Sequence, residues 1–557
     1  MRGSESSRSR LSSASKVTTS WGGVDLLGKK AFNYILPILA SVFSAVLLVL
    51  SFPSYELYWL AWLALVPLLV ALSGRSPIVS FLLSCVCTMF FFAIVFSFVL
   101  KVPGYRPLHH ALLDIYLGLL CALFGLVCGF IWRRCTGTVA LLAAPFVWVC
   151  IEYIRANFGF LAFPWVLLSH SQYKVLPVIQ ITSIAGGYGV SFLIVMVNAT
   201  IAACVLYLLH KLRKGPPSLG PQISRCGVVS MSTAAALLLI LTLLYGRGVV
   251  SRPIAGEGIK VAVVQGNIPQ NMKWDRRHAA YIMQTYTELT AEASKEKPEL
   301  IVWPESATPG PIDSNKRLHD EVSRIAKQAG GFLLLGSSYH EKLKPGSGRA
   351  LLNSAFLIGP ESGAGKQRYD KIRLFPFGEY LPMENRIPWS WINVPKMPGF
   401  SPGKTFTLFQ GPGFCFGVTI CWEILFPEMI REFVKNGAQF MVNITNEAWF
   451  GETVGPYHIL TASVFRAVEN RVYVVRCANT GISCFINPYG RVVDRVKDDK
   501  GQDIFVRGVL TETVIPMESR TVYTRYGDWL VWICFGVSLI FISVAFLRRK
   551  PDIDTPT

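Results

Sequence analysis

The stretch "GVTICWEILFPE" (Gly417–Glu428) decides how the second half of this 557-residue chain is interpreted. An apolar run ends at Cys421, and the amphipathic segment "FPEMIREFVKNG" begins a few residues later. A buried strand followed closely by a helix is typical of α/β layer folds. Reactive side chains in such folds gather at the carboxyl ends of strands. Most free cysteines are buried and inert, which would make Cys421 a filler residue. Its position at a strand end also allows it to be a nucleophile, and both interpretations stay open at this point.

The same alternation of strand and helix continues on both sides of this stretch. Apolar or β-branched runs predict strands at 258–268, 298–306, 331–340, 351–360, 413–420, 439–445 and 472–480. Helical periodicity predicts helices at 276–297, 315–330, 426–437 and 457–471. The sequence therefore predicts an α/β domain over roughly residues 256–516.

Two further reactive side chains occupy comparable positions in this domain. Glu305 ends the run "LIVWPES", and Lys371 lies in "QRYDKIRLFPFGEY", in the loop expected after the fourth strand. Each residue alone is weak evidence, since such glutamates and lysines are usually solvated. Together with Cys421 they are chemically consistent, because a carboxylate can take the thiol proton and an ammonium can stabilise the thiolate. The lysine would also face the oxyanion of a tetrahedral intermediate.

Histidine and metal chemistry fit the sequence less well. His278, His319, His340 and His458 fall in this domain, and none follows a predicted strand beside an obvious partner, which argues against a Cys-His pair. The thirteen cysteines include no C-x-x-C pair, so we expect neither structural zinc nor a cofactor. Cys415, Cys477 and Cys484 are expected to be small buried residues, with a Cys477–Cys484 disulfide as the alternative.

The first half of the chain has the composition of a membrane domain. Hydrophobic residues make up 52% of the chain and charged residues only 16%, below the roughly 25% of soluble proteins. Apolar stretches near the length needed to cross a bilayer predict spans at roughly 33–52, 57–73, 79–101, 111–132, 138–155, 184–209, 227–246 and 529–547. We therefore expect a membrane domain at 31–250 with seven spans, and an eighth span at 527–548.

The net charge of +19 is explained by orientation in a membrane better than by nucleic acid. If the N-terminus is cytoplasmic, the inner segments hold most of the Lys and Arg that flank the spans, and the short outer loops hold few. The pattern predicts disordered or short cytoplasmic tails at 1–30 and 549–557. It places the α/β domain on the extracytoplasmic side, and a cleaved signal peptide is disfavoured.

The motifs "WPES", "K…PFGEY" and "CWE", in this order, resemble the Glu-Lys-Cys signature of the nitrilase superfamily. With "VVQGNIPQNMKWD", "NITNEAWFG" and the spans, residues 31–547 resemble the apolipoprotein N-acyltransferase family. The resemblance implies an αββα sandwich joined to a membrane domain. It implies an enzyme of the bacterial inner membrane that uses no metal and moves an acyl chain through a cysteine thioester.

The resemblance also implies roles for individual residues. Glu305 would be the general base, Lys371 the stabiliser of the thiolate and oxyanion, and Cys421 the nucleophile. The remaining matches are supporting glutamates, Glu379 and Glu423, and aromatic residues expected near the lipid substrate, Trp274, Trp422 and Trp449. Position 422 departs from the family, which often has tyrosine there, so a role that needs a hydroxyl is in doubt.

Lipid substrates follow from the same resemblance. A phospholipid, typically phosphatidylethanolamine, would donate the acyl chain, and the α-amine of a diacylglyceryl-cysteine in a lipoprotein would accept it. Trp165, in "LAFPWVLLSHSQ" (Leu161–Gln172), would either floor a lipid cavity or act as an interfacial aromatic anchor.

Two other functions fit parts of the sequence. A membrane-tethered amidase or nitrilase would share the three reactive residues but pass the acyl group to water. A transporter or receptor would carry a non-catalytic domain, but transporters place ionisable groups in mid-span, and Asp114, Glu152 and Arg155 lie towards the ends of their predicted spans.

Overall fold

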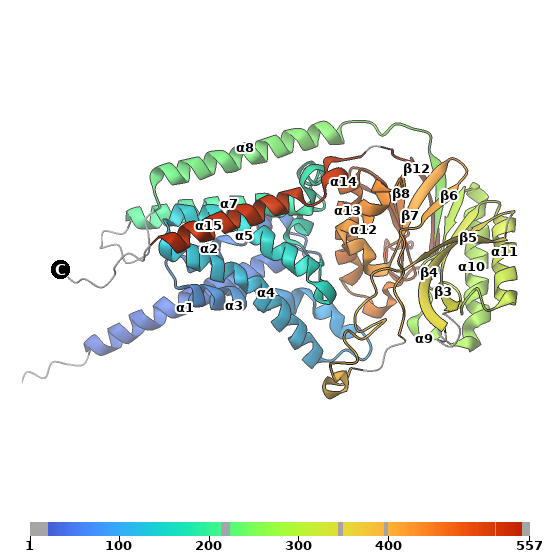
Figure 1. Ribbon diagram of the computed structural model, residues 1–557, viewed down its shortest axis with the longest axis horizontal. Coiled ribbons are helices and arrows are strands. Elements are labelled where there is room, and N and C mark those ends of the chain that lie inside the picture. Colours follow the sequence, from blue (N-terminus) through green and yellow to red (C-terminus); the bar gives the residue numbers. More distant parts are fainter. Residues whose placement is uncertain are drawn as a thin grey trace, which may run out of the picture.

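The computed structural model describes residues 21–212, 223–273, 275–342, 349–361, 363–394, 399–518 and 520–548. Long helices form one body, and two β-sheets with flanking helices form the other (Figure 1). The expected tails lie largely outside the described residues, although helix α1 (Trp21–Leu50) begins within residues 1–30.

The helical body contains most of the predicted spans. Within the described residues, six helices are long and apolar enough to cross a membrane: α3 (Pro77–Val95), α4 (Pro107–Arg134), α5 (Gly137–Asn157), α7 (Thr182–Leu212), α8 (Arg225–Val250) and α15 (Trp529–Leu547). The first two predicted spans fall on shorter apolar segments, Ile35–Leu50 of α1 and Tyr58–Leu72. The latter is divided into η1 (Tyr58–Trp62) and α2 (Val66–Leu72). The total of eight spans therefore stays a prediction.

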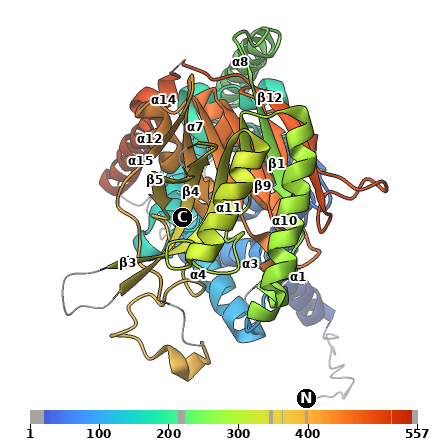
Figure 2. The ribbon, with the colours of Figure 1, turned by 90° about the vertical axis from the view of Figure 1, so that its right-hand side faces the viewer.

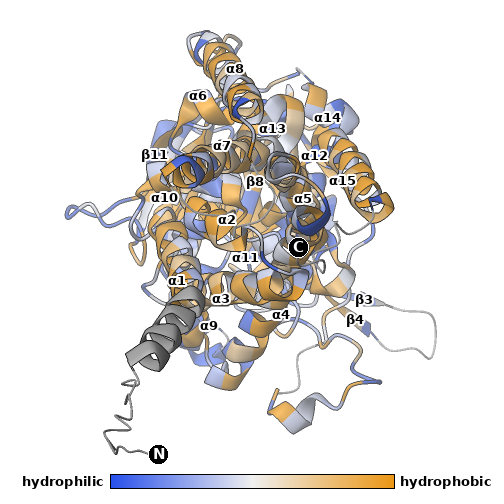
Figure 3. Cartoon of the chain, turned by 90° about the vertical axis from the view of Figure 1, so that its left-hand side faces the viewer, coloured by the Kyte–Doolittle hydropathy of each residue, from blue (hydrophilic) through white to orange (hydrophobic). Residues whose placement is uncertain are grey.

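The outer surface of the helical body is apolar. Leu237, Leu241 and Leu244 of α8 are exposed, as are Ile540 and Phe546 of α15. Figure 3 shows that hydrophobic residues cover much of the helices on this side of the molecule. Exposed apolar area on this scale is unfavourable in water, and it fits helices that face lipid.

The second body is built from two six-stranded sheets. One sheet has the order β12-β1-β2-β3-β4-β5, and the other has the order β11-β10-β9-β8-β7-β6. The first contains β1 (Ile259–Gln265), β2 (Leu300–Val302), β3 (Phe332–Lys342), β4 (Arg349–Gly359), β5 (Gly363–Asp370) and β12 (Gly508–Val514). The second contains β6 (Leu408–Gly411), β7 (Phe414–Ile420), β8 (Phe440–Thr445), β9 (Tyr473–Ala478), β10 (Cys484–Ile486) and β11 (Val492–Arg495).

Helices cover the outer face of each sheet, so the body is an αββα sandwich (Figures 1 and 2). Helices α10 (Ala279–Ala293) and α11 (Lys316–Ala329) cover the first sheet, and α12 (Pro427–Lys435) and α13 (Gly455–Asn470) cover the second. The short helices α9 (Gln270–Lys273) and α14 (Val522–Tyr526) flank the sandwich. Strands β1 and β2 are parallel, as are β7, β8 and β9, so their carboxyl ends lie at common edges. The expected sandwich fold is confirmed.

The strand and helix predictions agree with the structure, but they are incomplete. Each of the seven predicted strands and four predicted helices is present, while β5, β6, β10, β11 and β12 were not predicted. One site residue is affected: Lys371 follows β5, and it does not lie in the loop after β4. Strand β5, "GAGKQRYD", is rich in glycine and charged residues, so it carries little local strand signal. It forms by pairing with β4.

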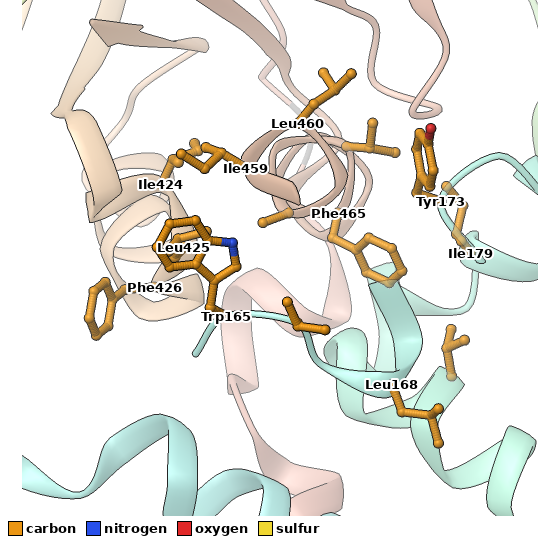
Figure 4. Close-up of a cluster of buried hydrophobic side chains, with 14 of the residues drawn as sticks. Trp165, Leu168, Tyr173, Ile179, Ile424, Leu425, Phe426, Ile459, Leu460 and Phe465 are labelled. Carbon is orange, nitrogen blue, oxygen red and sulfur yellow. The ribbon is translucent and has the colours of Figure 1, made fainter. Parts of the chain in front are cut away.

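An apolar interface joins the two bodies. Figure 4 shows side chains of the helical body, including Trp165, Leu168 and Ile179, beside side chains of the sandwich, including Leu425 and Phe465. All five residues belong to one cluster of buried hydrophobic side chains. Because Leu425 lies four residues after Cys421, this interface sets the segment that follows Cys421 against the helical body.

Candidate active site

Cys421 lies immediately after β7, at the start of the 3₁₀ turn η8 (Cys421–Leu425). Its backbone has φ +57°, in the left-handed region that non-glycine residues rarely adopt. Such a conformation costs on the order of 1–3 kcal/mol, and strained residues of this kind cluster at functional sites. Asn443 of β8 holds the turn, since its Nδ2 donates to the Cys421 carbonyl oxygen at 3.1 Å. The side chain is half-buried.

Glu305 lies three residues after β2 and is held by two neighbouring segments. Asn353 Nδ2 donates to Oε1 at 2.8 Å, and the backbone N–H of Asn446 donates to Oε2 at 2.9 Å. Its side chain is nearly buried. Both carboxylate oxygens are thus fixed in position, one from the β4 strand and one from the segment after β8.

Lys371 follows β5 and is 1% exposed. Its Nζ lies 3.0 Å from Glu379 Oε1 and 3.5 Å from Glu305 Oε1. Burial alone lowers the pKa of the Lys371 ammonium, but the carboxylates of Glu379 and Glu305 outweigh it and raise that pKa well above its ordinary value. The lysine is therefore a permanently charged group inside the site.

The Cys421 thiol lies close enough to the charges of Glu305 and Lys371 for them to shift its pKa. Burial, followed by the charge of Glu305, raises the pKa of Cys421 to about 12, while Lys371 opposes the shift. At neutral pH the resting thiol is therefore protonated. Its conversion to a nucleophile requires a base, and Glu305 is the carboxylate whose charge acts most strongly on it.

Glu379 completes the network around the lysine. Its Oε1 accepts hydrogen bonds from Lys371 Nζ and, at 2.9 Å, from Asn353 Nδ2, and its Oε2 accepts one from the Phe375 N–H at 2.7 Å. Asn353 therefore bridges Glu305 and Glu379. Glu379, which the sequence predicted as a supporting residue, thus holds the Lys371 ammonium in place.

Glu423 connects the nucleophile turn to the lysine loop. It is completely buried and accepts hydrogen bonds from the N–H groups of Ile420, Ile372 and Arg373 at 2.7–2.9 Å. The hydroxyl of Tyr369 donates to it as well. Since these donors flank both Cys421 and Lys371, the carboxylate fixes the Cys421 turn relative to the Lys371 loop.

Trp422 strengthens the same connection. Its indole Nε1 donates to the Arg373 carbonyl oxygen at 2.6 Å, and its ring packs edge-on against Phe375 and Phe426. A tyrosine here would offer a hydroxyl donor, and tryptophan offers an N–H donor instead. The departure at position 422 therefore keeps a hydrogen-bond donor.

The other predicted aromatic residues have different surroundings. Trp449, in η9 (Glu447–Phe450) after β8, is 42% exposed. Trp274 lies outside the described residues. Trp165 is 2% exposed. Among the described residues its ring contacts are Phe96, Phe98, Phe163 and Phe450, so these contacts do not include Glu305, Lys371 or Cys421. Its burial between the two bodies argues against an exposed interfacial anchor.

Several residues of the site escaped sequence reasoning. Asn353 lies in the middle of the predicted strand "LLNSAFLIGP", and Lys273 lies in a short helix without strong periodicity. An asparagine within an apolar strand was the available signal, because a buried amide requires partners. Asn446 contributes through its backbone, and no side-chain pattern reveals that role.

The remaining cysteines of the sandwich are free thiols. Cys477 and Cys484 are buried, and Cys415 is half-buried. The alternative of a Cys477–Cys484 disulfide is wrong, because Cys477 Sγ instead donates to the Val302 carbonyl oxygen at 3.1 Å.

Two family models match different parts of the chain. Residues 44–200 match the apolipoprotein N-acyltransferase N-terminal domain, and residues 260–515 match the carbon-nitrogen hydrolase family. A solved amidase from Nesterenkonia sp. is 19% identical over 48% of this chain and 93% of its own, with a TM-score of 0.34.

Full-length relatives extend the match across both bodies. An apolipoprotein N-acyltransferase of Geobacter metallireducens is 36% identical over 92% of this chain and 96% of its own. The apolipoprotein N-acyltransferase of Chlorobaculum tepidum is 31% identical over 74% of this chain and 78% of its own. That of Pasteurella multocida is 30% identical over 74% of this chain and 76% of its own. With six long apolar helices in its described residues, the chain is a multi-pass membrane protein. It belongs to the apolipoprotein N-acyltransferase family of the nitrilase superfamily.

Proposed function

We propose that this enzyme transfers an acyl chain from a phospholipid to the N-terminal amine of a diacylglyceryl-cysteine in lipoproteins, through a thioester on Cys421. Phosphatidylethanolamine is the proposed donor. The observation that carries the mechanism is the ion-paired cluster of Lys371, Glu305 and Glu379 beside a cysteine held at a strand end with positive φ. The wide match to N-acyltransferases supports the choice of acceptor.

The first half-reaction loads the enzyme. Glu305 takes the Cys421 proton as the thiolate attacks the ester carbonyl of the phospholipid, and the ammonium of Lys371 stabilises the oxyanion. The tetrahedral intermediate then collapses with loss of the lysophospholipid alkoxide. Glu305 returns the proton to this leaving oxygen, so the enzyme is left as a neutral thioester.

The second half-reaction unloads it. The neutral α-amine of the acceptor attacks the thioester carbonyl, Glu305 removes the amine proton, and the Cys421 thiolate leaves. Transfer of that proton to the thiolate restores the resting enzyme. One base and one cation serve both steps, because each step passes through the same kind of oxyanion.

Two lipids can reach such a site laterally if its entrance lies at the membrane surface. Leu425, just beyond the nucleophile, packs against the membrane body, and Trp449 remains 42% exposed after β8. Trp391, on the loop that follows Glu379, is 83% exposed. Large exposed aromatic side chains beside a buried site suit contact with the interfacial region of a bilayer.

The experiment that tests the function follows the acyl group by intact-protein mass spectrometry. With phosphatidylethanolamine and no acceptor, we expect the enzyme to gain the mass of one acyl chain. The adduct should disappear on addition of a diacylated lipopeptide, whose mass should rise by the same amount. Equally fast loss of the adduct to water without lipopeptide would instead favour an amidase-like hydrolase.

We also propose that the enzyme is in the bacterial inner membrane, with its sandwich on the extracytoplasmic side. The support is the Lys and Arg bias of the segments predicted to be inside, including Arg225 at the start of α8. The sandwich follows the opposite end of that helix, at Val250.

Labelling with a membrane-impermeant thiol reagent tests this orientation. We expect Ser314→Cys, at an exposed position before α11, to react in intact spheroplasts, because the sandwich faces outward. The exposed native Cys226, at the start of α8, is the internal control and should react only after lysis. The reverse labelling pattern would refute the orientation and the use of outer-leaflet lipid.

A further inference from the structure

A second lysine is buried beside the candidate active site. Lys273, the last residue of α9, is 3% exposed, and its Nζ donates to the backbone carbonyl oxygen of Glu305 at 2.8 Å. Within the described part of the chain this carbonyl is its one hydrogen-bond partner, and no carboxylate oxygen lies within 4.0 Å. Lysines are almost never fully buried unless they are paired, so this position needs an explanation.

The short helix that carries Lys273 is tied to the same glutamate by a second route. Gln270 Oε1, at the start of α9, accepts a hydrogen bond from Asn446 Nδ2 at 2.9 Å. The backbone N–H of Asn446 in turn donates to Glu305 Oε2. Glu305 is therefore held at its carbonyl by Lys273 and at its carboxylate by Asn446, and both contacts belong to one connected network.

Charge balance gives Lys273 a further role. Lys371 is paired with both Glu305 and Glu379, so these three groups together carry one net negative charge when ionised. Proton transfer from Cys421 to Glu305 leaves the summed charge of these three groups and the Cys421 sulfur unchanged. Glu423 also acts on Lys371, and whatever its protonation the ammonium of Lys273 makes the site one charge unit less negative when the thiolate forms.

We propose that Lys273 is a positioning residue of the acyl-transfer site. It holds the backbone of Glu305 and supplies a second positive charge beside Glu305 and the Cys421 thiolate. The proposal rests on the function proposed above. Lys273 acts through Glu305 and is not required to touch either substrate.

The pH dependence of acylation is the signature of such a charge. Burial lowers the pKa of Lys273 to about 8, while Glu305, from the segment after β2, and Cys421, from the end of β7, oppose the shift. Lys273 is charged below this pH and neutral above it. The rate of acyl-enzyme formation should therefore fall as the pH rises through about 8.

The test measures single-turnover acylation of Cys421 by mass spectrometry in three forms of the full-length enzyme, from about pH 6 to about pH 9.5. Lys273→Met keeps the apolar stem but removes the charge, and we expect acylation at least about tenfold slower at neutral pH, with no fall near pH 8. Lys273→Arg keeps the charge at every pH but must fit a larger guanidinium into a buried position, so its rate should lie between those of the wild type and Lys273→Met, without the alkaline fall. Lys295→Met, at an exposed lysine of η6 (Ser294–Glu296), is the matched control and should behave as wild type.

Thermal unfolding of each variant in detergent shows whether a slower acylation comes from misplacement of Glu305 or from a destabilised fold. Wild-type rates in Lys273→Met would overturn the proposal, as would an alkaline fall that persists in Lys273→Arg. Equal loss in both variants with a lowered unfolding temperature would assign Lys273 to folding and also overturn it. Failure of the proposed function is distinct, because the wild type itself would then form no adduct on Cys421.

Discussion

Replacement of Cys421 by alanine should abolish the acyl adduct that the wild-type enzyme forms with phospholipid. A thioester requires a thiol, and Cys421 supplies one at the end of β7, where the charges of Glu305 and Lys371 both act on it. We expect a loss of at least about 1,000-fold in acyl transfer, on the scale seen when a catalytic nucleophile is removed. Intact-protein mass spectrometry with neutral hydroxylamine, which cleaves thioesters, measures it.

The chain offers two cysteine controls for this prediction. Cys415 is half-buried on β7, the strand that Cys421 follows, and Cys477 is buried on β9. Cys415→Ala and Cys477→Ala should both retain the adduct. An adduct that moves to another cysteine in Cys421→Ala, or lipopeptide acylation without Cys421, would show that the thioester mechanism is wrong.

Lys371→Arg should lose most activity although the positive charge remains. Lys371 is 1% exposed between Glu305 and Glu379, so the larger planar guanidinium must displace one of these carboxylates or the oxyanion position. A reduction of about 100-fold in the rate of acyl-enzyme formation is expected, comparable to the loss of one oxyanion donor. The measurement is single-turnover acylation at saturating phospholipid.

Lys260→Arg is the matched control, because it makes the same exchange at an exposed lysine of β1. It should acylate at the wild-type rate. If Lys371→Arg kept near-normal turnover, the lysine would not be the compact cation that the mechanism requires. An unfolding temperature close to that of the wild type would show that the loss arises in the site and not in the fold.

Much of the architecture could be predicted from local sequence patterns. Continuous apolar runs such as "FMVNIT" fill the buried strands of a sandwich, and amphipathic segments such as "PEMIREFVK" cover them, so the order of these elements is visible in the sequence. Glu305 and Cys421 stood out because both follow such strands, and parallel strands bring their carboxyl ends to a common edge.

Pairing between distant segments was not visible in the same way. β12, at Gly508–Val514, pairs antiparallel with β1, at Ile259–Gln265, and the two lie far apart in the chain. β5 exists because β4 offers it a hydrogen-bonding partner. Strand preference depends on such neighbours more than on the residues themselves, so these strands have weak local signals.

By itself, the sequence determined that a chain with long apolar spans carries an α/β domain with a glutamate, a lysine and a cysteine in the order of a known triad. Composition and periodicity suffice for the spans and the domain, since burial of apolar residues is a local demand of each element, whereas the triad was implied by the resemblance of its motifs to those of the nitrilase superfamily. Only the tertiary structure decided which groups share protons and charge. Asn353 joins Glu305 to Glu379, Glu423 joins the Cys421 turn to the Lys371 loop, and Lys273 reaches the Glu305 carbonyl. Hydrogen bonds and ion pairs act over a few ångströms in space, and the separation of residues along the chain does not reveal that distance.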